Sequence, residues 1–189
     1  MDAVAFVTAE IEARRKAGSP LLVAVDGRCA SGKTTLASGI RKQTGCSVVP
    51  MDDFFLRPEQ RTRERLLLPG ENVDWERFLE QVLLPLRRGD AAKYRPWDCH
   101  AQAWKEPVVI ESRPVSLIEG AYSCHPALWD LYDFHIFLTV DALEQLRRIE
   151  HRNGKQAVAV FRDRWIPLEE QYFQAFQVTQ RCELCLDMT

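Results

Sequence analysis

Short, continuously apolar runs alternate along the chain with segments in which apolar residues recur every three or four positions. Runs of the first kind, bounded by Pro, Gly or Asp, are typical of strands buried on both faces of a parallel sheet, and the second kind of segment indicates helices. Strands are predicted over residues 21–25, 46–51, 115–118, 134–140 and 182–187. Helices are predicted over residues 4–16, 33–43, 75–86 and 142–151, with a further helical stretch over 165–176. Residues 57–70 are predicted as a polar loop and residues 94–106 as irregular structure.

The alternation of strands and helices predicts an α/β fold with a mainly parallel, five-stranded sheet and right-handed crossovers. We expect a single domain over residues 1–189, a size that buries enough surface to fold without disulfides. Ligands of such sheets bind beyond the carboxyl ends of the strands. The first three predicted strands end at Asp26-Gly27, Asp52-Asp53 and Glu119-Gly120, so acidic residues are expected at that edge.

A glycine-rich segment follows the first predicted strand and opens the second predicted helix. Gly-Arg-Cys-Ala-Ser-Gly-Lys-Thr matches G-x-x-x-x-G-K-[ST] at every position, a pattern whose backbone N–H groups surround the phosphates of a nucleotide. Lys33 is expected to contact the β- and γ-phosphates and Thr34 to offer its hydroxyl to Mg²⁺. The predicted nucleotide-binding residues are Gly27, Arg28, Cys29, Ala30, Ser31, Gly32, Lys33, Thr34 and Thr35. An ordinary glycine-containing turn is the alternative, and Cys29 is either a tolerated loop residue or a thiol of lowered pKa.

Composition excludes several classes of protein. A net charge of −2 argues against a protein that coats nucleic acid or an anionic membrane. No apolar run approaches the ~20 residues that cross a bilayer, and the first residues lack the apolar core of a secretory signal, so a cytoplasmic location is expected. The six cysteines are expected to be reduced, because the Cys182–Cys185 pair falls on a predicted strand where residues three apart face opposite sides.

Five segments together resemble the uridine kinase branch of the P-loop kinases, to which phosphoribulokinase, pantothenate kinase and nicotinamide riboside kinase are related. They are the glycine-rich segment with the strand before it, Met-Asp-Asp-Phe-Phe at 51–55, Asn-Val-Asp-Trp at 72–75, Ile-Glu-Gly at 118–120, and Arg-Arg at 147–148. The resemblance runs from about residue 21 to 180. It implies the three-layer P-loop NTPase fold, an acceptor-binding insertion at about 54–106 and a helical lid at about 147–164. It also implies transfer of the γ-phosphate of ATP to a hydroxyl of a uridine- or cytidine-like nucleoside or a similar metabolite.

The resemblance also implies roles for single residues. Asp52 aligns with the base that receives the proton of the acceptor hydroxyl. The neighbouring Asp53 is the alternative for this role. Glu119 aligns with an acid that holds Mg²⁺, so Thr34, Asp52 and Glu119 are the expected metal site. Arg147, Arg148 and Arg152 would belong to the lid and act with Lys33 on the transferred group. The alternative for these arginines is a solvated helix face in which Glu144 pairs with Arg148.

The acceptor pocket departs from the family pattern. Asp74 matches an aspartate that contacts the sugar, but it is equally suited to cap the helix that follows. Tyr94 matches the family, whereas His100 falls one position late, which puts uridine in doubt. Trp97 and Trp104 either stack on a base or fill the core. Arg57, Arg61, Arg63 and Arg65 form a basic loop that is either solvated surface or a contact for a phosphate-bearing acceptor or nucleic acid.

Two other functions stay open at this point. The same phosphoryl transfer to a sugar or vitamin precursor fits the same motifs. A regulator that binds ATP, hydrolyses it slowly and signals by conformation also fits the glycine-rich loop. The expected partner is a small hydroxyl-bearing acceptor, with no membrane and no nucleic acid, and a homo-oligomer is compatible with the sequence.

Overall fold

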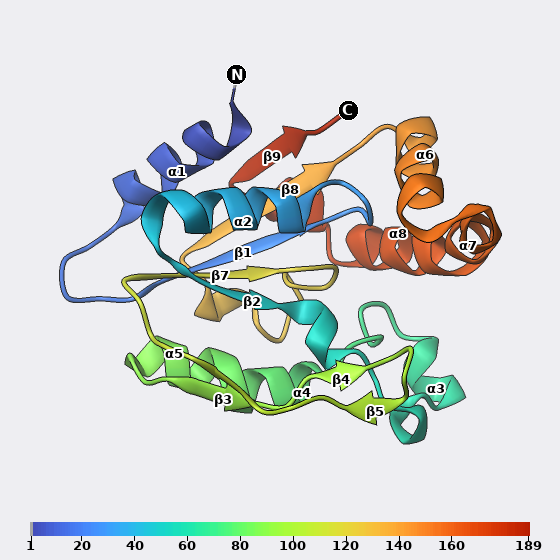
Figure 1. Ribbon diagram of the computed structural model, residues 1–189, viewed down its shortest axis with the longest axis horizontal. Helices are drawn as coiled ribbons and strands as arrows, with labels where there is room; N and C mark the ends of the chain where they lie inside the picture. The colour runs from blue at the N-terminus through green and yellow to red at the C-terminus, as the bar shows by residue number, and fades with distance from the viewer. Residues whose placement is uncertain (1) are drawn as a thin grey trace.

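A five-stranded parallel sheet forms the centre of the computed structural model, which describes residues 2–189 (Figure 1). Its strands are β1 (Leu21–Gly27), β2 (Ser47–Pro50), β7 (Val115–Glu119), β8 (Phe134–Thr139) and β9 (Leu184–Asp187). The spatial order is β2-β7-β1-β8-β9, with every neighbouring pair parallel. The α/β fold and the mainly parallel sheet predicted from the sequence are confirmed. The last strand is shorter than predicted and starts at Leu184.

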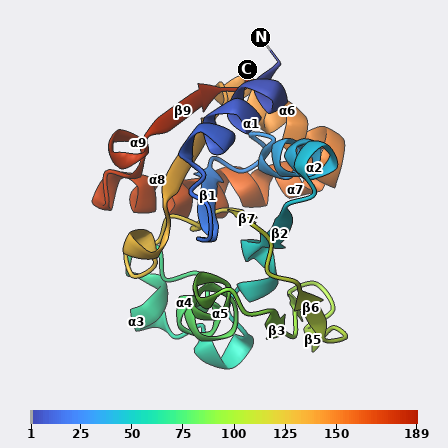
Figure 2. The same cartoon turned by 90° about the vertical axis from the view of Figure 1, so that its left-hand side faces the viewer.

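Alternate residues of β1 face two separate cores, which makes the molecule three-layered (Figure 2). Leu21, Val23 and Val25 pack beneath α1 (Ala3–Arg14) and α2 (Lys33–Thr44). Leu22 and Ala24 face the opposite core, which also contains Tyr172 and Phe173 of α8 (Ile166–Ala175). A strand whose two faces are both covered must be apolar throughout, which explains the continuous run in the sequence.

Residues 51–110 extend from the sheet beyond β2 as a lobe of short elements (Figure 1). The helical elements are η1 (Met51–Phe54), η2 (Pro58–Gln60), α3 (Arg63–Leu66), α4 (Trp75–Phe78), the π-turn η3 (Leu79–Leu83) and α5 (Leu84–Arg88). Two antiparallel ribbons follow, β3 (Ala92–Tyr94) with β6 (Val108–Ile110), and β4 (Trp97–Asp98) with β5 (Ala103–Trp104). The prediction of irregular structure over 94–106 was therefore wrong in part, because strands of two or three residues are too short to show a period.

The chain after β8 forms consecutive helices beside the glycine-rich loop (Figure 1). They are α6 (Ala142–Asn153), α7 (Lys155–Val160), the π-turn η5 (Phe161–Trp165), α8 and α9 (Val178–Arg181), with η4 (Trp129–Leu131) before β8. Gly154, at φ +84°, separates α6 from α7. The helical stretch predicted from residue 165 thus continues a run that begins at Lys155. None of the helices among residues 2–189 has both the length and the apolar composition to span a bilayer.

Candidate functional site

The glycine-rich loop turns tightly between β1 and α2, and its two glycines have distinct reasons to be glycine. A Cβ on Gly27, at φ +134°, would lie 2.1 Å from the backbone oxygen of Leu138, so no other residue fits against β8. The Arg28 N–H donates to the same oxygen at 3.1 Å. Gly32, at φ +98°, is the N-cap of α2 without a capping side chain. The free N–H groups of the first turn therefore face the loop, which is an arrangement that binds anions.

Lys33 places a positive charge inside this loop. Its side chain is buried, and its Nζ donates to the backbone oxygens of Gly27 at 2.7 Å and Arg28 at 2.8 Å. The Ser31 hydroxyl is also buried and has no hydrogen-bond partner among the described residues. A buried ammonium and an unpartnered hydroxyl beside free backbone N–H groups fit the phosphates of a nucleotide.

Thr34 and Glu119 meet although 85 residues separate them. The Thr34 hydroxyl lies 3.1 and 3.2 Å from the two carboxylate oxygens of Glu119. Glu119 is the last residue of β7 and lies in register with Val25 of β1 and Pro50 of β2, so its carboxylate reaches the edge where both strands end. A hydroxyl and a carboxylate side by side are the hard oxygen donors that Mg²⁺ prefers.

Asp52 follows β2 in η1 and lies close to the same edge. A Cβ on Gly120, at φ +143°, would lie 3.2 Å from Oδ1 of Asp52 and 2.9 Å from the Cβ of Met51. The glycine after Glu119 thus gives Asp52 the room to lie against the end of β7. Asp52 keeps exposed surface, so a ligand at this edge can reach it.

The carboxylates at this edge all have raised pKa values. The surrounding protein raises the pKa of Asp52, and the charges of Lys33 and Arg152 oppose that rise. Burial also raises the pKa of Glu119, and the negative charge of Asp52 raises it further. Neighbouring carboxylates repel each other, and a cation bound between them would relieve this repulsion. Groups with such shifted pKa values are typical of functional sites.

Cys29 is not an activated thiol. Burial and the charge of Glu169 raise its pKa to about 12. The thiol is therefore protonated at neutral pH, and the lowered pKa considered for it from the sequence is wrong, because burial, reinforced by the Glu169 charge, outweighs the charge of Lys33. The Cys29 N–H donates to Glu169 at 2.9 Å, and Arg28 forms an ion pair with Glu170 at 2.7 Å.

The three arginines predicted to belong to a lid occupy different positions. Arg147 is largely exposed and donates to both oxygens of Glu144. Arg148 also pairs with Glu144 at 2.7 Å, and it reaches the backbone oxygens of Ala30 at 3.4 Å and Met188 at 2.6 Å. Arg152 is close enough to lower the pKa of Asp52, and its Nε bonds only to the adjacent Asn153. Of the three, Arg152 is therefore the one whose charge acts on Asp52.

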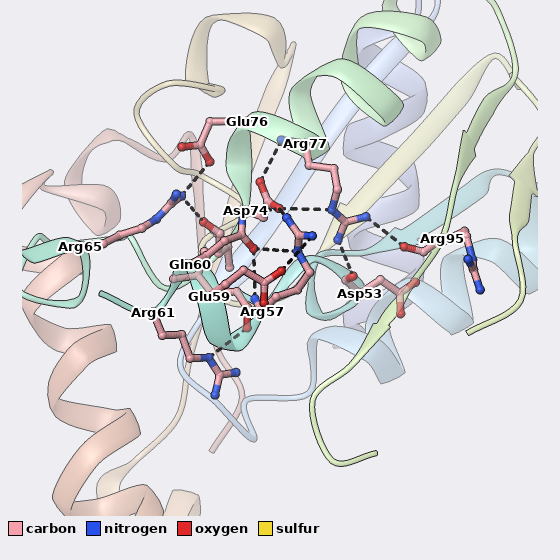
Figure 3. Close-up of polar contacts among 12 residues, drawn as sticks. Asp53, Arg57, Glu59, Gln60, Arg61, Arg65, Asp74, Glu76, Arg77 and Arg95 are labelled. Atoms are coloured by element: carbon pink, nitrogen blue, oxygen red, sulfur yellow. Dashed lines mark hydrogen bonds and ion pairs between the residues drawn. The ribbon is translucent and has the colours of Figure 1, made fainter. Parts of the chain in front are cut away.

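Asp74 caps the helix that it precedes. It is buried, and its Oδ1 accepts from the Arg77 N–H at 3.2 Å, while its Oδ2 accepts from Gln60 at 2.8 Å (Figure 3). The guanidinium groups of Arg77 and Arg57 lie 3.4 and 4.0 Å from the same carboxylate. The capping role weighed from the sequence is present, and Asp74 is also the centre of a charged cluster.

Tyr94 and His100 are separated by the β4–β5 ribbon. The buried Tyr94 hydroxyl donates to Asp53 at 2.9 Å, which directs Asp53 away from the glycine-rich loop and toward the lobe. His100 is exposed at the tip of the ribbon, where its N–H bonds to Asp98 at 2.9 Å. The structure thus brings Tyr94 near Asp53 and Asp52, and it leaves His100 at the surface.

Two arginines of the basic loop, Arg61 and Arg63, have no carboxylate partner among the described residues. Arg57 pairs with Glu59, and Arg65 pairs with Glu71 and Glu76. The Arg61 guanidinium bonds to the backbone oxygen of Leu56 and lies 3.6 Å from the sulfur of Cys99. Burial raises the pKa of the Cys99 thiol, Arg61 lowers it and the charge of Asp52 raises it further, so Arg61 and Asp52 both lie within electrostatic reach of this thiol.

Sequence reasoning missed two acidic residues that hold the site together. Asp26, expected at the ligand-binding edge, is instead fully buried and accepts from the N–H groups of Gly27, Tyr122 and Cys124 and from the Tyr172 hydroxyl. Glu169 lies on α8 and is buried against the loop, where burial raises its pKa to about 7. The only available signal was an acid within an otherwise apolar helix face, and it does not say which loop the acid meets.

Solved structures of other proteins superpose on nearly the whole chain. The chain matches no protein-family model. It superposes on a "possible uridine kinase" from Bacillus stearothermophilus with a TM-score of 0.73 and 20% identity, covering 98% of both chains. A provisionally assigned fructose transport system kinase from Silicibacter sp. TM1040 gives 0.73 and 24%, covering 98% of this chain and 99% of that one. D-glycerate 3-kinase from Cryptococcus neoformans gives 0.63 and 18%, covering 98% and 93%.

These three matches extend over nearly the whole chain and share one architecture. The chain therefore has the fold of the P-loop small-molecule kinases, in the form that the uridine kinase-like protein represents. The family resemblance seen in the sequence is confirmed at the level of the fold. At 24% identity or less, the matches show the fold and leave the acceptor to the chemistry of the site.

Proposed function

We propose that this protein is an ATP-dependent kinase that phosphorylates a hydroxyl group of a small metabolite. The observation that carries the proposal is the convergence of three strand ends. The loop with Lys33, the Thr34–Glu119 pair and Asp52 all lie at one edge of the sheet. Anion cradle, cation ligands and base are the parts that phosphoryl transfer requires, and a protein that only binds a nucleotide has no use for the base.

The residues present fit ATP and Mg²⁺. The loop N–H groups, Lys33 and the unpartnered Ser31 hydroxyl would hold the β- and γ-phosphates. Thr34 and Glu119, with Asp52 beside them, would hold Mg²⁺, which usually keeps several waters and shares phosphate oxygens as ligands. Bound there, the metal supplies positive charge to the phosphate oxygens.

The chemistry assigned to this chain's own residues is simple. Asp52 accepts the proton of the acceptor hydroxyl while the oxygen of that hydroxyl bonds to the γ-phosphorus. The bond from the γ-phosphorus to the bridging oxygen breaks and releases ADP. Lys33 and Arg152 stabilise the negative charge on the transferred group. The raised pKa of Asp52 makes it a stronger base than an aspartate of ordinary pKa, which favours proton acceptance.

A nucleoside is one candidate acceptor, on the resemblance of Asp74 and Tyr94 to the family pattern. A specific observation favours a second candidate, a non-nucleoside acceptor that carries an anionic group. Asp74 is already engaged by its own helix, Gln60 and two arginines, and His100 is at the surface, so neither is directed at a sugar. Arg61 has no carboxylate partner among the described residues and lies within electrostatic reach of the same Cys99 thiol as Asp52, so it would pair with an anion.

The decisive experiment combines an acceptor panel with a base variant. ADP release should rise above background with at least one member of a panel of nucleosides, sugars, hydroxy acids and vitamin precursors. Asp52→Asn should lower kcat by about 10²–10⁴-fold while ATP affinity stays nearly unchanged, because the proton transfer belongs to the transition state. Asp90→Asn, an exposed acid distant from the site, serves as the matched control.

One result would contradict the proposal, and another would change only the residue assigned as the base. A flat background across the whole panel would favour a nucleotide-dependent regulator. Unchanged turnover in Asp52→Asn together with a large loss in Asp53→Asn would move the base by one position and would leave the kinase proposal standing.

A further inference from the structure

A pocket lies in the lobe, separate from the glycine-rich loop, and Arg77 and Tyr94 form part of its lining. It encloses about 350 Å³ and is lined by Arg77, Gln81, Lys93, Tyr94, Arg95, Trp104 and Pro107. Arg77 and Gln81 come from consecutive turns of the α4–η3 helix, and Lys93 and Arg95 extend from β3 and the residue after it. The volume is within the range of small-molecule sites.

The lining of this pocket carries positive charge only. Three of its seven residues are cationic and none is acidic. Within residues 2–189, neither Lys93 nor Arg95 takes part in an ion pair, and both are exposed. The only hydrogen bond of the Arg95 side chain goes to the backbone oxygen of Lys105, at 3.1 Å. Figure 3 shows the Arg95 side chain extending away from the carboxylates that hold the other arginines.

Trp104 forms an aromatic wall that two of these cations, Arg77 and Arg95, contact. Its side chain is 37% exposed, and the guanidinium carbons of Arg57, Arg77 and Arg95 lie 5.3, 5.2 and 6.0 Å from its ring. The indole is fixed by Trp97, which is its partner across the β4–β5 ribbon and packs edge-on at 5.3 Å. Guanidinium groups gathered over one aromatic ring remain available to bind a second, negatively charged partner.

The pocket shares two residues with the neighbourhood of the proposed base. Tyr94 lines the pocket and donates its hydroxyl to Asp53, the residue after Asp52. Arg77 also lines it, and its Nη2 donates to the backbone oxygen of Asp53 at 3.0 Å. The pocket wall is therefore bonded directly to the segment that carries Asp52.

We propose that this pocket is a binding site for a small ligand with a phosphate or carboxylate group, held by Lys93 and Arg95 against Trp104. The shared chemistry allows two sources, the anionic end of the acceptor or a separate effector. The two free cations are the groups that pair with the anion, and Arg77 is already held by Asp74 and Asp53 and serves as a fixed wall.

The test reads binding at the pocket itself and does not require kinase activity. The indole N–H resonance of Trp104, assigned by its loss in Trp104→Phe, is followed while phenyl phosphate is added. We expect a saturable shift, no comparable shift with uncharged phenol, and affinity at least tenfold weaker in Lys93→Gln/Arg95→Gln. Arg41→Gln/Lys42→Gln removes the same charge from the exposed end of α2 and should bind as the unmodified protein does.

The outcomes separate this proposal from the kinase proposal. Displacement of phenyl phosphate by an acceptor found in the panel would assign the pocket to the anionic end of that acceptor, and simultaneous binding would assign it to an effector. Both outcomes support the anion site. If the shift is saturable but no acceptor gives turnover, the anion site stands and only the kinase proposal is contradicted. Equal shifts with phenol, or equal affinity in Lys93→Gln/Arg95→Gln and the unmodified protein, would overturn the anion site.

Discussion

Asp26 offers a test of what holds together the edge of the sheet that carries the glycine-rich loop. Its Oδ1 accepts from the N–H groups of Gly27 at 2.7 Å and Tyr122 at 3.2 Å. Its Oδ2 accepts from the Cys124 N–H at 2.8 Å and the Tyr172 hydroxyl at 2.9 Å. One carboxylate thereby joins β1, the segment after β7 and helix α8. Asp26→Asn keeps the shape and replaces one of the two acceptor oxygens by a donor.

The size of the effect follows from counting donors. The tyrosine hydroxyl can rotate to accept from the new amide, but the Cys124 N–H cannot, so one buried donor is left without a partner. Such a group costs about 1–3 kcal/mol, and the loss of charge in the remaining hydrogen bonds adds to it. Burial disfavours the charge of Asp26 and raises its pKa, so replacing the carboxylate by a neutral amide recovers part of the lost stability. We expect a net loss of about 2 kcal/mol, or roughly 4–8 °C in melting temperature for a chain of this size.

Urea unfolding followed by circular dichroism measures this loss directly. Tyr172→Phe is the companion variant, because it removes one donor and leaves the carboxylate with three, so it should cost about 1 kcal/mol. Asp90→Asn should unfold as the unmodified protein does. If Asp26→Asn lies within about 0.5 kcal/mol of the unmodified protein, the range of ordinary surface substitutions, the anchoring role is refuted.

Four further predictions concern the loop and its surroundings. Gly27→Ala should abolish nucleotide binding and destabilise the fold, because its Cβ would meet the Leu138 backbone at 2.1 Å, and calorimetry with ATP would show both losses. Glu169→Gln should flatten the pH dependence of stability. The folded pKa of about 7 exceeds the ordinary 4.5, so the stability that protonated Glu169 provides is lost as pH rises between these values, by up to about 3 kcal/mol in unfolding measurements from pH 5 to 8. Arg152→Gln should lower kcat at least tenfold and Arg147→Gln should leave it within twofold, since only Arg152 acts on Asp52; equal effects would contradict the assignment. Thr34→Val should raise the Mg²⁺ concentration needed for half-maximal turnover, and an unchanged Mg²⁺ titration would exclude Thr34 as a ligand.

The sequence predicted the sheet and the loop well because both depend on local patterns. A strand buried on both faces must be apolar along its length, and a tight phosphate loop must place glycine at Gly27 and Gly32. The lobe was harder, because its ribbons are two or three residues long and its helices are interrupted by a π-turn. In such short elements the side-chain contacts, and not the periodicity, decide the conformation.

Long-range partners could not be predicted for a different reason. Glu169 and Asp26 are single acidic residues whose partners lie more than 90 residues away in the chain, at Cys29 and Cys124. The motif predicted that Arg28 and Cys29 belong to a phosphate-binding loop, but it gave no sign that carboxylates of α8 hold both of them. For the lid, the pattern placed three arginines on one helix, and only coordinates separate Arg152 from the pair that binds Glu144.

The contact between Gly27 and the backbone of β8 has a thermodynamic consequence. β8 holds the loop through the Arg28 N–H and α8 holds it through the Cys29 N–H, while Lys33 Nζ joins the loop's own Gly27 and Arg28 oxygens. A triphosphate that enters such a rigid cradle has little main-chain freedom to suppress, so most of the interaction energy is retained as affinity. Association should then carry a small entropic penalty from the polypeptide, with fast on-rates set by diffusion and charge.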